Sequence, residues 1–222
     1  MEARELSIAV GSERVSGLLL RSDGAKALFV FAHGAGVGMR HANMESNARG
    51  LAERGIATLR YQFPYMEKGS KRPDPPRIAH AAVRAAVAQA GELAGDLPLF
   101  AGGRSYGGRM TSQAQSLEPL RGVRGLAFLG FPLHPAGDPG IERAEHLAQM
   151  QLPMLFVSGE RDALAELALL ESVVAELAER ATLHVIAAAD HTLKVPASSG
   201  RTNAEAEGEA LDVIAEWIAS GH

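Results

Sequence analysis

The chain of 222 residues contains no cysteine. This absence excludes disulfide bonds, metal sites built from thiolates and a thiol nucleophile. The sequence also has no apolar run that approaches the length of a membrane span. The first residues, Met1–Glu5, lack the apolar core of a signal peptide. We therefore expect a protein of the cytoplasm with no membrane partner.

The sequence has no marked excess of charge of either sign, since its formal net charge is −4. No basic surface that would attract a nucleic acid or an anionic membrane is therefore expected. Hydrophobic residues make up 46% and charged residues 22%, which is ordinary for a globular protein. The length suits a single domain, residues 1–222, with a full α/β core. The composition is compatible with a monomer or a homodimer.

Short apolar runs alternate with helical patterns along the chain, which predicts an α/β fold with a mostly parallel central sheet and helices on both of its faces. The first two runs are expected to pair as an antiparallel hairpin. The region 131–153 is rich in proline and too short for a large lid, with one short helix expected at 141–149. The predicted strands are 6–10, 15–20, 27–32, 57–61, 97–101, 123–129, 154–157 and 183–187, and the predicted helices are 42–54, 77–90, 105–115, 164–177 and a final one around 210–218.

One motif dominates the sequence: residues 103–107 read Gly-Arg-Ser-Tyr-Gly and follow the predicted strand 97–101. This Gly-x-Ser-x-Gly pattern is typical of a nucleophile elbow, a strained turn that raises a serine hydroxyl above a sheet. The glycines leave room where a Cβ atom would collide with a neighbouring strand or helix. We therefore predict that Ser105 is a nucleophile at the amino end of a helix, where the helix dipole favours negative charge.

A serine hydroxyl is a weak nucleophile near neutral pH and needs a base, which in turn needs an acid that holds its tautomer. In this class of fold the three residues follow strands in the order Ser, Asp or Glu, His. Asp162 follows the predicted strand 154–157, and His191 follows the predicted strand 183–187. We therefore predict His191 as the base for Ser105 and Asp162 as the acid that orients His191.

Other readings of the aspartates remain open at this point. Asp138 follows the preceding strand, 123–129, and is an alternative acid. Asp190 is a weaker alternative, because a direct sequence neighbour rarely points at the adjacent histidine with the required geometry. Asp162 itself is also suited to a turn or N-cap before the predicted helix 164–177, since aspartate favours such positions.

Acyl transfer also needs hydrogen-bond donors for the developing oxyanion. We predict that these are the backbone N–H groups of Tyr106, directly after the nucleophile, and of Ala35, in a turn after the strand 27–32. This turn reads His-Gly-Ala-Gly from residue 33, and its small residues allow close approach of a substrate. Gly34 and Gly36 are alternatives to Ala35 as the second donor, and both are candidate substrate-binding residues.

Two side chains near these segments are further candidates for binding substrate. Arg104 stands beside the nucleophile, and Phe63 begins a loop, 63–76, after the strand 57–61. Most other basic side chains are expected to be solvated. The glycines after residue 33 match a dinucleotide motif poorly, because Met39 stands at its last glycine position. No cofactor and no metal ion are therefore expected.

Four segments resemble the α/β-hydrolase superfamily in order and spacing over nearly the whole chain. They read His-Gly-Ala-Gly from 33, Gly-Arg-Ser-Tyr-Gly-Gly-Arg from 103, Gly-Glu-Arg-Asp from 159 and Asp-His from 190. With Arg-Tyr-Gln-Phe-Pro-Tyr from 60, they look more narrowly like the small KANL3/Tex30-like branch. Dienelactone hydrolases are similar in size and also lack a lid, but typically carry cysteine where Ser105 stands. The resemblance implies an α/β-hydrolase fold with no large lid domain.

The leading hypothesis is a serine hydrolase that cleaves an ester or thioester of a small acyl substrate through an acyl-enzyme. The alternative is a catalytically weak, hydrolase-like scaffold that acts through protein partners, because the narrower branch includes proteins better known as subunits of complexes. Suitable residues occupy all three candidate catalytic positions, which favours catalysis over the scaffold alternative.

Overall fold

The computed structural model describes residues 2–221 and contains an eight-stranded sheet with the order β1-β2-β4-β3-β5-β6-β7-β8. β1 pairs with β2 and β2 with β4 in antiparallel fashion, and all other neighbours are parallel. This confirms the predicted mostly parallel sheet and its opening hairpin. The strands are β1 (Arg4–Val10), β2 (Glu13–Leu20), β3 (Ala27–Ala32), β4 (Ile56–Tyr61), β5 (Leu99–Arg104), β6 (Val123–Leu129), β7 (Met154–Gly159) and β8 (Ala181–Ile186).

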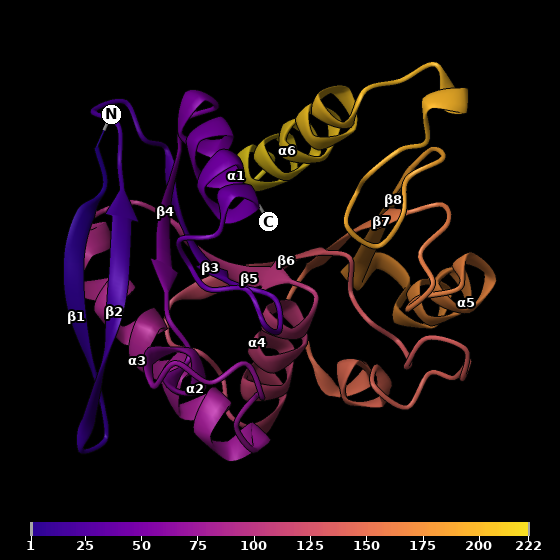
Figure 1. The fold of residues 1–222 in the computed structure, drawn as a ribbon. Coiled ribbons are helices and arrows are strands. Elements are labelled where there is room, and N and C mark those ends of the chain that lie inside the picture. The colour runs from indigo at the N-terminus through magenta and orange to yellow at the C-terminus, as the bar shows by residue number, and fades with distance from the viewer. Residues whose placement is uncertain (1, 222) are drawn as a thin grey trace.

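Helices cover both faces of the sheet, as Figure 1 shows. The pair α1 and α6 lies on one face, and α3, α4 and α5 lie on the other. The helices are α1 (Ala42–Glu53), α2 (Pro64–Glu67), α3 (Pro76–Ala94), α4 (Tyr106–Leu117), α5 (Leu167–Leu177) and α6 (Asn203–Ala219), with short 3₁₀ turns η1 (Glu145–Gln149), η2 (Ala178–Arg180) and η3 (Ala197–Ser199).

The two-sided core follows from the strand sequences. All six residues of β3 are buried, and alternate side chains enter different hydrophobic clusters. Leu28 and Val30 pack on the side of α3 and α4, whereas Phe29 and Phe31 pack on the side of α1 and α6. A strand covered on both faces is expected to be continuously apolar.

Two local predictions need correction. The expected loop 63–76 begins with the short helix α2, because Pro64 stands at its first position, where the missing N–H and the restricted φ of proline are tolerated. The helix expected at 141–149 is only the 3₁₀ turn η1. Within residues 2–221 the connection from β6 to β7 holds no longer helix, and no large lid covers the sheet.

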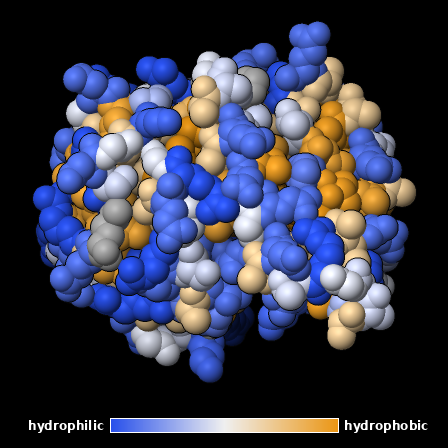
Figure 2. Space-filling model, turned by 90° about the horizontal axis from the view of Figure 1, so that it is seen from above, coloured by the Kyte–Doolittle hydropathy of each residue, from blue (hydrophilic) through white to orange (hydrophobic). Residues whose placement is uncertain are grey.

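The surface seen from the side of α1 and α6 is mostly hydrophilic (Figure 2). Apolar atoms gather toward the side on which β8 lies, and this edge strand is mostly half-buried. No helix among residues 2–221 is long and apolar enough to cross a membrane.

The parallel strands place their carboxyl ends at one edge of the sheet, where ligands bind in open α/β folds. Ser105 follows β5, Asp162 follows β7, and His191 follows β8. The topology therefore brings together three residues that are far apart in the sequence.

Candidate active site

Ser105 occupies a strained turn between β5 and α4. Its backbone has φ 47° and ψ −116°, a conformation that costs a residue with a side chain about 1–3 kcal/mol. Two hydrogen bonds hold the turn: the Ser105 N–H donates to the Leu129 carbonyl at 3.0 Å, and the Arg109 N–H donates to the Ser105 carbonyl at 3.1 Å. The predicted elbow is thus present, with the serine at the amino end of α4.

The motif glycines are needed because neighbouring backbone comes very close. A Cβ atom on Gly103 would lie 2.3 Å from the Ala32 carbonyl oxygen. A Cβ atom on Gly107 would lie 2.6 Å from the carbonyl oxygens of Ala32 and His33. Both glycines therefore let β5 and α4 pack against the end of β3, from which the turn at residue 33 begins.

Ser105, His191 and Asp162 form a continuous chain of hydrogen bonds. The Ser105 Oγ lies 2.8 Å from His191 Nε2, and His191 Nδ1 lies 2.9 Å and 2.8 Å from the two carboxylate oxygens of Asp162. An ionised carboxylate only accepts, so Nδ1 carries the proton and Nε2 accepts from the serine hydroxyl. The Asp162 side chain is fully buried, whereas the His191 side chain is 19% exposed.

The structure also distinguishes Asp162 from the two other aspartates that were considered as the acid. Asp162 makes both of the contacts considered for it. Its Oδ1 accepts from the Leu164 N–H at 2.8 Å, as a turn residue does, and also from the imidazole of His191. Among residues 2–221, no hydrogen bond or ion pair joins Asp138 or Asp190 to the His191 ring.

Asp190 instead shapes the loop that carries the histidine. Its Oδ1 accepts from the Thr192 N–H, the Thr192 hydroxyl and the Lys194 N–H at 2.7, 2.8 and 3.0 Å. Burial raises the pKa of Asp190, but these hydrogen bonds outweigh it and hold the pKa below its usual value. Glu160, directly after β7, supports the same loop, since its carboxylate accepts from the Ala188 N–H at 2.6 Å.

The turn after β3 holds the backbone of Ala35 beside the serine. His33 anchors it: Nδ1 donates to the Gly34 carbonyl at 2.8 Å, and Nε2 accepts from the Phe63 N–H at 3.1 Å. Burial lowers the pKa of His33 to about 4, so the ring is neutral at physiological pH. The Gly36 N–H donates to the Tyr65 hydroxyl at 3.2 Å and is therefore already engaged.

The amides predicted as oxyanion donors are free of other partners. Within residues 2–221, neither the Ala35 N–H nor the Tyr106 N–H donates a hydrogen bond. Both residues directly adjoin the serine turn, Tyr106 by sequence and Ala35 through Gly34, whose Cβ position lies 4.0 Å from the Ser105 Cβ.

A cavity of about 450 Å³ opens over Ser105 and His191. Its lining includes three of the six predicted substrate-binding or oxyanion residues, Gly34, Ala35 and Arg104. The other three, Gly36, Phe63 and Tyr106, are not among its lining residues. Its apolar part was not predicted, because β6, α1 and the turn after β7 contribute to it across long sequence separations. Besides Ser105, His191, Gly34, Ala35 and Arg104, the lining residues are Val37, His41, Asn43, Met44, Leu129, Leu164, Thr192 and Lys194.

Phe63 does not reach this cavity, which corrects the expectation that it contacts substrate. Its side chain is 0% exposed and packs edge-on against the rings of His33, Tyr61 and Tyr106, at centroid distances of 4.9, 5.2 and 5.3 Å. Its contribution to the site is its backbone N–H, which fixes the His33 ring.

Arg104 does line the cavity, and two contacts hold its guanidinium. Nη1 donates to the Asn47 side-chain oxygen at 3.1 Å, and Nη2 donates to the Thr192 carbonyl at 3.0 Å. Neither partner could be predicted from the sequence, because Asn47 lies within α1, outside any motif, and Thr192 contributes only its backbone carbonyl.

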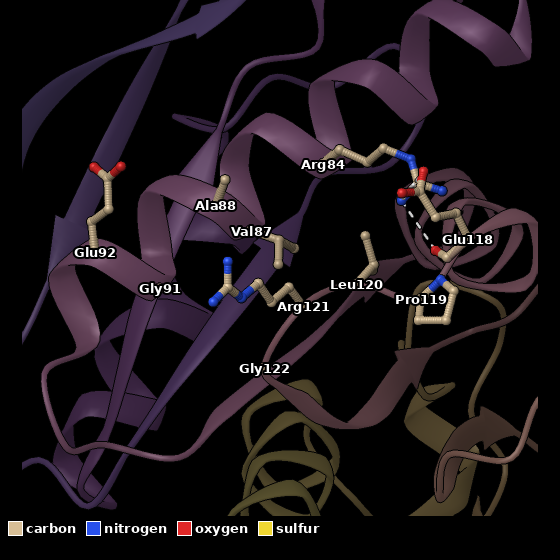
Figure 3. A pocket seen from close by; sticks show the side chains of 10 residues that line it. All are labelled: Arg84, Val87, Ala88, Gly91, Glu92, Glu118, Pro119, Leu120, Arg121 and Gly122. Carbon is tan, nitrogen blue, oxygen red and sulfur yellow. Dashed lines mark hydrogen bonds and ion pairs between the residues drawn. The ribbon is translucent and has the colours of Figure 1, made fainter.

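A separate hollow of about 660 Å³ lies between α3 and the segment after α4 (Figure 3). Its lining includes Val87, Leu120 and Arg121, and Gly122 at its margin directly precedes β6. It therefore lies at the amino ends of the parallel strands, away from the serine. Within residues 2–221, no group of three or more His, Asp or Glu side chains could hold a metal ion.

The whole chain matches solved structures of hydrolases, although at low sequence identity. A dienelactone hydrolase from Anabaena variabilis has a TM-score of 0.79 and 21% identity, with 99% of each chain covered. A lidless α/β serine hydrolase from Xanthomonas campestris has a TM-score of 0.74 and 16% identity, covering 98% of this chain and 95% of that one. An esterase domain from Rhodothermus marinus has a TM-score of 0.73 and 16% identity, with 98% of each covered. At these identities, the likeness establishes the fold.

The family is established by the sequence itself. A family model described as "Alpha/beta hydrolase domain" matches residues 25–219, which include the serine, the aspartate and the histidine of the site. The narrower KANL3/Tex30-like branch stays a prediction. The chain belongs to the alpha/beta hydrolase family.

Proposed function

We propose that this protein hydrolyses carboxylic esters or thioesters of small acyl substrates, with Ser105 as the nucleophile. The observation that carries the proposal is the hydrogen-bonded chain from the serine hydroxyl through His191 to the buried Asp162 carboxylate, with heavy-atom distances of 2.8–2.9 Å. The esterase and serine hydrolase names of similar structures support the same class of reaction.

In the first half of the proposed reaction, Ser105 Oγ attacks the acyl carbonyl carbon while His191 Nε2 takes the hydroxyl proton. The imidazolium that forms is stabilised by Asp162, which keeps its own charge. The proton on Nε2 then passes to the leaving alcohol or thiol as the bond from carbon to this group breaks. Ser105 is left as an acyl ester.

In the second half, water attacks this acyl ester and gives a proton to His191 Nε2. The bond to Ser105 Oγ breaks, the serine recovers the proton, and the acid is released. In both halves the carbonyl oxygen becomes negative, and the free N–H groups of Ala35 and Tyr106 are the proposed donors to it. The amino end of α4 favours the same charge.

The cavity indicates a short acyl chain. The cavity has a volume of about 450 Å³ and apolar walls from Val37, Met44, Leu129 and Leu164, and no large lid formed by residues 2–221 extends it. We therefore expect acetyl to butyryl esters to be cleaved faster than octanoyl or longer esters.

The proposal is tested by following hydrolysis of an ester series from acetate to decanoate with the wild type and Ser105→Ala. We expect the substitution to lower kcat/KM by about 10³-fold or more, because the nucleophile is removed. Ser172→Ala, an exposed change on α5, should leave the rates unchanged. A wild type without activity toward any ester would favour the scaffold alternative.

A further inference from the structure

Within residues 2–221, Arg104 lacks the carboxylate partner that several other arginines with partly buried side chains have, a lack that it shares with Arg109 and Arg180. Arg54, Arg60 and Arg201 each lie within 2.8 Å of a carboxylate oxygen. No carboxylate of residues 2–221 forms an ion pair with Arg104. Its two acceptors, from Asn47 and Thr192, are neutral. A largely desolvated guanidinium whose hydrogen-bond acceptors are neutral gains a stronger interaction from an anionic partner.

The guanidinium also has unused hydrogen-bonding capacity. It offers five N–H donors in a planar fork, and only two of them have acceptors. None of its nitrogen atoms belongs to the fully enclosed, unpartnered polar atoms of the described chain. Arg104 lines the cavity over Ser105 and also a smaller hollow that shares Thr192 and Lys194 with this cavity and includes Glu207. A molecule bound over the serine can therefore approach the guanidinium from the side of the first cavity.

The lining of this cavity is electrostatically one-sided. Arg104 and Lys194 carry positive charge, and no aspartate or glutamate belongs to the lining residues. The nearby carboxylates of Glu207 and Asp190 favour the charged form of Arg104, but other groups engage them. Glu207 accepts from the side chains of Ser46 and Asn47, and Asp190 accepts from the backbone of its own loop.

We propose that the substrate of this site carries a carboxylate at the far end of a short acyl chain, and that Arg104 binds this carboxylate while the ester carbonyl lies at Ser105. The inference rests on the proposed ester hydrolysis. A guanidinium binds a carboxylate through two parallel charge-assisted hydrogen bonds, which fixes orientation as well as position. Lys194 adds a second positive charge at the same wall. Half-esters of short dicarboxylic acids are the simplest substrates of this class.

Comparing the hydrolysis of two ethyl esters of nearly equal shape, one charged and one neutral, distinguishes an effect of charge from an effect of size. Monoethyl succinate ends in a carboxylate, and ethyl levulinate ends in a neutral methyl ketone. We expect the wild type to hydrolyse monoethyl succinate with a kcat/KM about 10-fold or more above that for ethyl levulinate, chiefly through a lower KM. Both reactions release a proton and can be followed by titration at constant pH.

Arg104→Gln removes the charge and should reduce this preference by about 10-fold, while hydrolysis of ethyl levulinate falls much less. Lys194→Gln should reduce the preference by a smaller factor. Arg121→Gln makes the same change of charge at the hollow of Figure 3 and should leave the preference as in the wild type.

The outcomes distinguish this inference from the proposed function. A wild type that hydrolyses both esters with equal kcat/KM overturns the inference alone, whatever the variants do. A wild type that hydrolyses neither ester, nor any other, overturns both. If Arg104→Gln loses all activity because its contacts with Asn47 and Thr192 are lost, the wild-type ratio and Lys194→Gln decide.

Discussion

Gly159, at the end of β7, faces the carbonyl oxygen of Asp190 so closely that a Cβ atom on the glycine would lie 2.4 Å from it. The same Cβ would lie 2.4 Å from the Ala189 carbonyl oxygen. The loop that carries His191 therefore rests directly on the backbone of the strand that precedes Asp162. This contact sets the distance between the imidazole and the carboxylate.

Gly159→Ala should push this loop outward and lengthen the hydrogen bonds of His191. We expect kcat to fall by about 10- to 100-fold, since displacement of a catalytic group by about 1 Å costs about 10²-fold in rate. The measurement is ester hydrolysis at saturating substrate. Gly208→Ala on α6 is the matched control, because a Cβ there meets nothing within 4 Å. It should keep full activity and raise the free energy of unfolding by about 0.5–1 kcal/mol.

Asp162→Asn should preserve the shape of the site but remove the negative charge that stabilises the imidazolium. We expect kcat to fall by about 10³- to 10⁴-fold with little change in KM. Asp138→Asn provides the comparison, because this exposed aspartate was the competing candidate and forms no hydrogen bond or ion pair with His191. Comparable losses in the two variants would contradict the assignment of the acid.

His33 should make the stability of the protein depend on pH between 4 and 6.5. The unfolded chain binds a proton on this histidine below its ordinary pKa of 6.5, whereas burial lowers the folded pKa to about 4. Protonation therefore favours the unfolded chain, and the free energy of unfolding should fall by up to about 3 kcal/mol as the pH drops from 6.5 to 4.

The measurement is denaturant unfolding of the wild type and His33→Gln across this pH range. Burial also lowers the pKa of His146 to about 4, so the wild type contains contributions from both residues. The variant should show a shallower dependence on pH. Identical slopes would exclude His33 as a buried neutral residue.

The sequence was sufficient for the parts of the site that depend on local chemistry. The Gly-x-Ser-x-Gly turn needs small residues wherever backbone approaches backbone, and Gly103 and Gly107 meet that need against Ala32. The positions of Asp162 and His191 followed from the order of strands, because parallel strands bring their carboxyl ends to one edge.

Other features depend on contacts that no local pattern encodes. Phe63 was a candidate for the substrate pocket, yet it lies in the core because His33, Tyr61 and Tyr106 surround it. Most basic side chains other than Arg104 were expected to be solvated, but that of Arg60 is fully buried and its guanidinium lies 2.8 Å from the Glu45 carboxylate. Such placements are decided by partners far along the chain, which a single sequence does not identify.

The role of Ser105 as nucleophile is tested most directly by reaction of the protein with a fluorophosphonate, followed by mass spectrometry of the intact chain and of its peptides. We expect one covalent adduct, located on Ser105, and no adduct in Ser105→Ala. Labelling should also slow greatly in His191→Gln, because the serine then lacks its base. An unlabelled wild type, or equal labelling of Ser105→Ala, would show that Ser105 is not an activated nucleophile.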